Sequence, residues 1–225
     1  MPRTPSSARA PRVLAATLIA LTAISLSGCF GGGAPDAAPS RSPEPTATAT
    51  EVPADGEAGT TLTFAQGTDL TTDDFVQWSD GFIADDGWKV DKPDDGNGSW
   101  TYRTVDGACT VQFWQGATTG SAVAASSDDS AASDELIAFV LETDAATVTP
   151  AAATDSFSYQ LGGEGAVENR FVTGNDGDRT WMLSARAFTA LEAGLWQLID
   201  CTGGDPAAVR ADVHDKSAVI LMPAS

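Results

Sequence analysis

Two turns of this chain gather oxygen-bearing side chains of the kind that bind hard cations. The side chains are Asp91, Asp94, Asp95 and Asn97 at the first turn and Asn175, Asp176 and Asp178 at the second. Calcium takes several oxygens at about 2.3–2.6 Å. An EF-hand loop, however, needs Gly at its sixth position, where these two loops carry Ser99 and Trp181. Because Asp, Asn and Gly are also the residues that turns require, we interpret both clusters as turns and predict no metal site.

The residues that nucleophilic or metal-assisted catalysis needs are scarce. The chain has one histidine, His214, and no Gly-x-Ser-x-Gly elbow, phosphate loop, dinucleotide fingerprint or His-Glu-x-x-His motif. Zinc sites and His-based triads therefore have almost nothing to build on. Two carboxylates could act as in a glycosidase, but no pair stands out among the 31 acidic residues. We predict that the protein is not an enzyme and has no cofactor, and we rank a wall-polymer hydrolase last.

Six tryptophans are many for a domain of this size. Most are expected to fill the core, because aromatic side chains bury a large apolar area. Trp88 and Trp100 flank the first acidic turn, and we take them as the candidate ligand-binding residues. They would either stack on sugar rings of a wall polysaccharide or line an apolar pocket between sheet and helices.

An apolar run near the N-terminus ends at a cysteine. Three arginines precede the run, residues 13–26, which is well short of the roughly 20 residues that span a bilayer as a helix. The stretch Leu26-Ser27-Gly28-Cys29 then resembles the lipobox of bacterial lipoproteins, and the Lys-poor, Ala- and Thr-rich composition resembles secreted actinobacterial proteins. The resemblance implies a signal peptide over 1–28, diacylglycerol on Cys29, and anchoring at the extracytoplasmic face of the cell membrane. Ordinary secretory cleavage, with Cys29 left as a thiol, is the alternative.

The segment after Cys29 differs in composition from the rest of the chain. Residues 29–58 are rich in Gly, Pro, Ala and Thr without apolar periodicity, so we predict a flexible tether there and one folded domain over 59–225. Removing residues 1–28 deletes three of the 12 basic residues and no acidic one, which changes the formal net charge from −19 to −22. Nucleic acid and anionic headgroups are therefore poor partners. We expect the negative charge to serve solubility alone, and binding of a cationic ligand is the alternative.

The lipobox assignment leaves two cysteines whose pairing can be predicted. If Cys29 carries lipid, Cys109 and Cys201 are an even pair in an oxidising compartment, for which a disulfide is expected. A catalytic thiol would need a base, and His214 lies on a helix that we expect to be exposed.

Local patterns predict an α+β domain with an antiparallel sheet and helices packed on one face. Strands are predicted at 61–64, 88–90, 100–105, 109–114, 147–149, 157–161, 169–172, 180–185, 195–199 and 218–222. Helices are predicted at about 72–82, after Ser133 as N-cap, and after Asp205-Pro206.

The two halves of the domain share a weak pattern. Phe75 and Phe157 are 82 positions apart, Trp100 and Trp181 are 81 apart, and Trp114 and Trp196 are again 82 apart. We hypothesise an internal duplication, with chance matches among the tryptophans and Asp-Gly turns as the alternative. For function, the sequence favours a non-catalytic binding or accessory lipoprotein with a cell-wall partner. The alternative is an interaction or structural component of a membrane complex.

Overall fold

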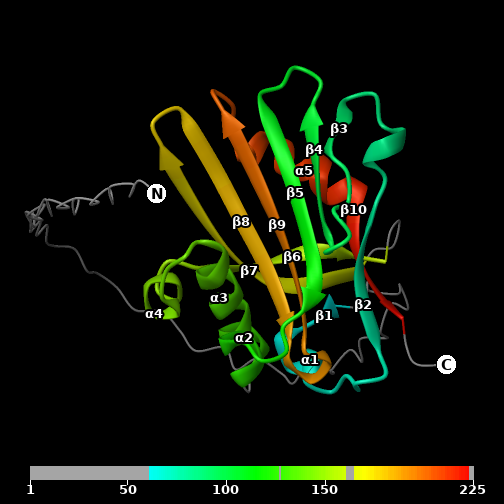
Figure 1. The fold of residues 1–225 in the computed structure, drawn as a ribbon, viewed down its shortest axis with the longest axis vertical. Helices are drawn as coiled ribbons and strands as arrows, with labels where there is room; N and C mark the ends of the chain where they lie inside the picture. The colour runs from blue at the N-terminus through cyan, green and yellow to red at the C-terminus, as the bar shows by residue number, and fades with distance from the viewer. Residues whose placement is uncertain (1–60, 127, 161–164, 223–225) are drawn as a thin grey trace, which may run out of the picture. The chain divides into compact units, whose positions relative to one another are not determined.

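The strands of the domain form a single ten-stranded sheet in the order β2-β10-β6-β7-β8-β9-β5-β4-β3, with the short β1 paired to β7 (Figure 1). The computed structural model describes residues 61–126, 128–160 and 165–222, which belong to one compact unit of the chain, Val52–Ser225. Within these residues only the pairs β1·β7 and β10·β6 are parallel. The domain is therefore an α+β domain dominated by an antiparallel sheet, as predicted.

The elements have the following bounds. The strands are β1 (Thr61–Leu62), β2 (Phe75–Asp80), β3 (Trp88–Lys92), β4 (Ser99–Thr104), β5 (Cys109–Ala117), β6 (Ala153–Tyr159), β7 (Gly165–Asp176), β8 (Arg179–Phe188), β9 (Ala193–Thr202) and β10 (Ser217–Met222). The helices are α1 (Phe64–Gly67), α2 (Ala122–Ala125), α3 (Asp129–Val140), α4 (Ala145–Val148) and α5 (Pro206–Lys216). Two 3₁₀ turns, η1 (Phe82–Ala84) and η2 (Thr189–Leu191), complete the described chain.

Local turn and cap residues explain two features that the sequence predicted, the β4–β5 hairpin and the start of α5. Gly107, in the β4–β5 turn, has a φ of 79°, a left-handed conformation that favours glycine. Asp205 caps α5 by accepting a hydrogen bond from the backbone of Ala207, and Pro206 occupies the first turn as expected. The predicted strands over 88–90, 100–105, 109–114 and 180–185 are confirmed.

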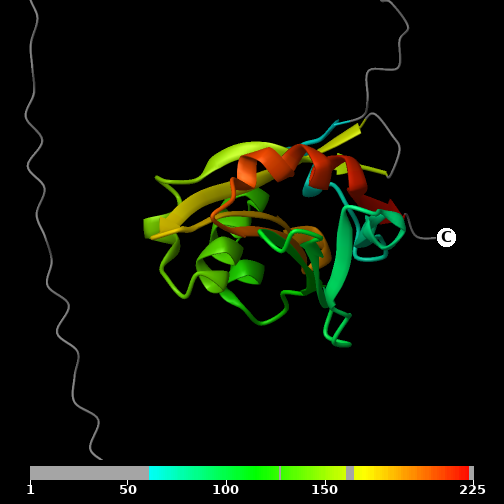
Figure 2. The ribbon, with the colours of Figure 1, turned by 90° about the horizontal axis from the view of Figure 1, so that it is seen from above.

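The helices lie on both faces of the sheet, so the prediction of one covered face is wrong (Figure 2). Helix α3 contributes Leu136 and Ile137 to a core that contains Leu183 of β8. Helix α5 contributes Val213 to a second core that contains Ile199 of β9. Central strands such as β9 carry apolar side chains at successive positions, and burying both faces of such a strand requires cover on both sides.

The segment predicted as a helix over 72–82 forms strand β2 instead. Val76 and Trp78 are buried two positions apart, whereas Phe75 is 52% exposed, which is the period of a strand. Pairing with β10, which places Trp78 opposite Val219, determines the outcome. The segment 147–149 is also not a strand, because α4 covers Val148 and its neighbours. Helix α3 begins at Asp129, four residues before the predicted N-cap Ser133.

The two halves resemble each other in part of the sheet but not in the helices. Strands β2 to β5 precede the long helix α3, and strands β6 to β9 precede α5, but β2 pairs with β10 and not with β3. The meanders β3-β4-β5 and β6-β7-β8-β9 meet where β5 pairs with β9. Trp114 pairs there with Trp196, as a two-fold axis perpendicular to the sheet would require. That axis would place both long helices on the same face, yet α3 and α5 lie on opposite faces. Trp100 and Trp181 also pack into different cores, so they are not equivalent.

Candidate functional site

The cysteine pair lies at the junction of the two halves. Cys109 on β5 and Cys201 on β9 are direct partners across the strand pair and form a disulfide, with their Cα atoms 4.1 Å apart. The predicted disulfide is therefore confirmed. The predicted lipidation residue Cys29, the predicted signal peptide and the predicted tether lie outside the described residues.

The structure separates the two tryptophans that were predicted to bind a ligand together. Trp88 is buried against Phe82, with ring centroids 5.0 Å apart, and its indole N–H donates to Asp212 of α5 at 2.6 Å. Trp88 is thus part of the core. Trp100 is only partly buried and lines an open pocket.

This opening, which we call the Trp100 pocket, has a volume of about 360 Å³. Its lining comes from β2, η1, β3, β4, β5 and the β3–β4 turn. The lining residues are Asp80, Ile83, Val90, Lys92, Pro93, Asp94, Trp100, Tyr102 and Gln115. Apolar walls with a few polar groups are typical of small-molecule sites.

The indole of Trp100 is held in place from two directions. One side stacks on Phe113, with centroids 5.6 Å apart and planes at 20°. The indole N–H donates to one oxygen of Asp80 at 3.0 Å, while the Tyr102 hydroxyl donates to the other at 2.8 Å. Burial, together with the neighbouring Asp80 carboxylate, raises the pKa of Tyr102, so this hydroxyl remains a donor. One carboxylate on β2 therefore fixes two aromatic side chains of β4.

The rim of the Trp100 pocket combines apolar side chains with one positive and one negative side chain. Ile83 is 81% exposed and Val90 48% exposed. Lys92 and Asp94 also belong to the lining. A ligand here would meet apolar edges, an aromatic wall and separate donors and acceptors.

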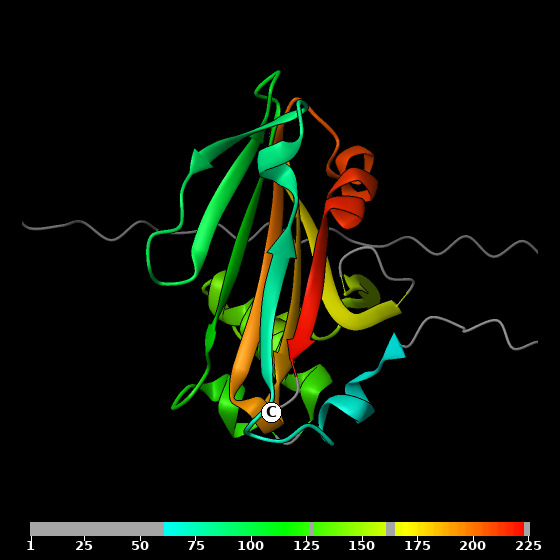
Figure 3. The same cartoon turned by 90° about the vertical axis from the view of Figure 1, so that its right-hand side faces the viewer.

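A second opening adjoins the first, and we call it the Phe75 pocket. Its volume is also about 360 Å³, and Gln115 lines both pockets. The lining comprises Thr72, Asp74, Phe75, Val76, Gly98, Gln115, Gly116, Ala117, Leu191, Glu192 and Ala193. The sheet curls so that the edge strand β2, which runs beside β10 in Figure 3, approaches β5. Trp78 makes this contact, since its backbone N–H donates to the Gln115 side chain at 2.7 Å and its indole N–H to the Trp114 carbonyl at 3.0 Å.

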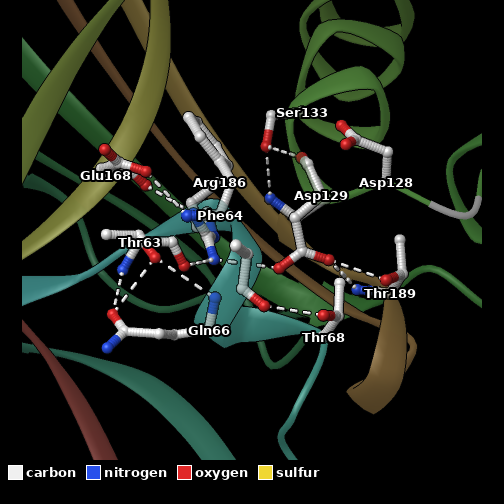
Figure 4. A network of polar contacts seen from close by, with 12 residues as sticks. Thr63, Phe64, Gln66, Thr68, Asp128, Asp129, Ser133, Glu168, Arg186 and Thr189 are labelled. Carbon is white, nitrogen blue, oxygen red and sulfur yellow. Dashed lines mark hydrogen bonds and ion pairs between the residues drawn. The ribbon is translucent and has the colours of Figure 1, made fainter.

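A buried ion pair forms a separate polar centre at the start of α3 (Figure 4). The side chains of Arg186 and Asp129 are fully buried and 2.9 Å apart. The guanidinium also donates to the carbonyls of Thr63 and Glu168, both at 3.0 Å. Burial lowers the pKa of Arg186, and the Asp129 carboxylate opposes this effect. No solvent reaches the pair, so we assign it to holding α1, α3 and β8 together and not to ligand binding.

Gly67 of α1 makes this arrangement possible. A Cβ atom at Gly67 would lie 2.0 Å from the Asp129 carboxylate and 2.2 Å from the Arg186 guanidinium. Only glycine allows α1 to pack this closely on the pair.

The carboxylates of the acidic turn beside Trp100 accept hydrogen bonds from the backbone of the same turn. Asp94 accepts from the backbone N–H of Gly96 at 2.9 Å, and Asp95 accepts from that of Asn97 at 2.7 Å. These are the local bonds expected of turn residues. Among the described residues, no group of three or more His, Cys, Asp or Glu side chains is placed to hold a metal ion.

A narrow cavity lies between α5 and the sheet, with Asn169, Gln197 and His214 in its lining. Its volume is about 20 Å³, room for about one water molecule, so we exclude it as a site for a larger ligand.

Sequence reasoning identified Trp100 as a ligand-binding candidate, assigned Asp94 to a turn and missed the other residues of the Trp100 pocket. Asp80, Tyr102 and Gln115 stand on three different strands, and no spacing connects them. The alternation of Val76 and Trp78 was the one signal for strand β2, and the helical spacing of Phe75, Trp78 and Phe82 outweighed it.

Two comparisons with known proteins found no match for this chain. No family model matches the chain, and no curated protein is similar enough in sequence to count as a match. In the part of the chain that the structure describes, no helix is long and apolar enough to cross a bilayer.

Proposed function

We propose that this chain is an extracytoplasmic lipoprotein, anchored in the cell membrane through Cys29, whose folded domain binds a sugar ring of a cell-envelope polymer in the Trp100 pocket. The anchor rests on the Leu26-Ser27-Gly28-Cys29 stretch. The binding role rests on one observation: Trp100 is fixed against Phe113 and Asp80, and it lines an open pocket of about 360 Å³.

A fixed indole suits the apolar face of a sugar ring. A flat aromatic surface that is already ordered loses little conformational entropy when a ligand stacks on it. Lys92, Asp94 and Gln115 belong to the same lining and supply donors and acceptors for hydroxyl groups. A cationic ligand is the second candidate, because a cation binds the face of an indole and the pocket contains two carboxylates.

Binding is a better account than catalysis. Both oxygens of Asp80 already accept hydrogen bonds, one from Trp100 and one from Tyr102. A carboxylate occupied in this way is poorly suited to act as a nucleophile or proton donor. Asp94, the other carboxylate of the lining, accepts the backbone N–H of Gly96.

The test is calorimetric titration of the full-length protein in detergent with N-acetylglucosamine. We expect binding that Trp100→Ala weakens about tenfold or more, as for an anchor residue at the centre of a site. Trp181→Ala is the control, because Trp181 is also partly buried but does not line the pocket. Thermal melts establish that each variant is folded.

Equal affinities of the Trp100→Ala variant and the unchanged protein would refute the proposal. Binding of a quaternary ammonium salt, lost in Trp100→Ala, with no response to the sugar would favour the cationic ligand.

A further inference from the structure

We infer that the Trp100 pocket and the Phe75 pocket together form one site for an uncharged linear oligosaccharide, with one sugar ring in each. This inference rests on the proposed function of the Trp100 pocket. The two pockets share Gln115 and have the same volume, about 360 Å³ each.

Strand β2 sets the spacing of the two pockets. Val76 lines the Phe75 pocket, and Asp80 lines the Trp100 pocket. Four residues of a strand span about 13 Å. A ligand that contacts both ends must therefore be extended, and a single sugar ring is too short.

The two pockets repeat one chemical arrangement. The Trp100 pocket combines an aromatic ring with the Asp80 carboxylate, and the Phe75 pocket combines an aromatic ring with Glu192. The Phe75 side chain is 52% exposed, and Glu192 accepts a hydrogen bond from the Thr119 hydroxyl at 3.0 Å. An aromatic ring beside a carboxylate thus occurs in both pockets, as expected for a site that binds a polymer of similar rings.

Gln115 favours a carbohydrate over a peptide. An extended peptide would bind an edge strand through its backbone hydrogen bonds. At the middle of β2, however, the backbone N–H of Trp78 already donates to the Gln115 amide oxygen at 2.7 Å. This leaves the Gln115 amide nitrogen, between the two pockets, as a donor for the oxygen atoms of a ligand.

The charge of the pockets argues against an anionic polymer. Four carboxylates line the two pockets, against one cationic side chain, Lys92. The carboxylates are those of Asp74, Asp80, Asp94 and Glu192. A phosphate-rich or carboxylate-rich chain would be repelled, so an uncharged oligosaccharide fits better than an anionic one.

Calorimetric titration of the full-length protein with N-acetylglucosamine and its β-1,4-linked dimer, trimer and tetramer tests the inference. We expect affinity to rise about tenfold, or about 1.4 kcal/mol, from the monomer to the length that reaches the second pocket, because a second ring then stacks in the Phe75 pocket. Phe75→Ala should abolish this rise, and Glu192→Gln should reduce it. Phe139→Ala is the matched control, since Phe139 is 75% exposed on α3 and lines neither pocket.

The outcomes separate the two proposals. Monomer binding that depends on Trp100 but does not strengthen with length would overturn the two-ring site and leave the proposed function intact. A rise with length that persists in Phe75→Ala would also overturn it. Loss of every response, or no effect of Trp100→Ala on any ligand, would overturn the proposed function itself.

Discussion

Replacing Asp129 by alanine is expected to lower the free energy of unfolding by about 3–5 kcal/mol, the cost of leaving a buried charge without its partner. Arg186 has no exposed surface and would keep its charge in an apolar setting between Phe64 and Phe188, whose ring centroids lie 4.4 and 4.7 Å from the guanidinium carbon. The Thr189 backbone N–H and hydroxyl, both bonded to Asp129, would lose their acceptor as well. Urea unfolding followed by circular dichroism measures the change.

The neighbouring carboxylate supplies the control. Asp128 is exposed and caps α3 through the Ala131 backbone N–H at 2.9 Å, so Asp128→Ala should cost about 1 kcal/mol. The double variant Asp129→Ala/Arg186→Met should lose less than the sum of the two single losses, because removing both charges leaves neither unpaired. If Asp129→Ala costs no more than Asp128→Ala, the buried pair does not have the structural role assigned to it.

Removing the Cys109–Cys201 disulfide is expected to lower the free energy of unfolding by a similar amount, about 4–5 kcal/mol. The two cysteines are 92 positions apart, and cross-linking a loop of that length restricts the unfolded chain strongly. The folded state should persist, because β5 and β9 pair over the whole length from Cys109–Cys201 to Ala117–Ala193. The measurement is urea unfolding of Cys109→Ala/Cys201→Ala beside the unchanged protein.

Reduction with a thiol gives an independent comparison. The reduced wild-type protein should unfold at nearly the urea concentration of the double variant, and the reductant should leave the variant unchanged. A loss below about 1 kcal/mol would contradict the prediction and would imply that the unfolded chain is already restricted by residual structure.

Elements with local causes could be predicted from the sequence. The hairpin at Asp106-Gly107 depends on a glycine with positive φ, and the start of α5 on the Asp205-Pro206 cap. Strand β2 could not, because its partner β10 lies more than 130 residues later and the spacing of Phe75, Trp78 and Phe82 imitates a helix. Pairing with the distant strand β10 therefore determines that residues 75–80 form a strand.

Of the candidate site, only the ligand-binding role of Trp100 was predicted from the sequence. Trp88 and Trp100 flank the same turn, yet Trp88 is buried because its indole N–H meets Asp212, 124 positions along the chain. Trp100 is only partly buried, and its indole N–H donates to Asp80 on the edge strand β2. Both outcomes depend on contacts that only the topology creates, and no local pattern contains them.

The central claim, that Trp100 forms the wall of a sugar site, is tested most directly by nuclear magnetic resonance of the indole N–H groups. Six tryptophans give six indole resonances, which single substitutions assign. On addition of N-acetylglucosamine to the full-length protein in detergent, we predict that the Trp100 resonance shifts and saturates, while those of Trp88 and Trp181 do not move. A sugar that binds while the Trp100 resonance stays in place would contradict the account.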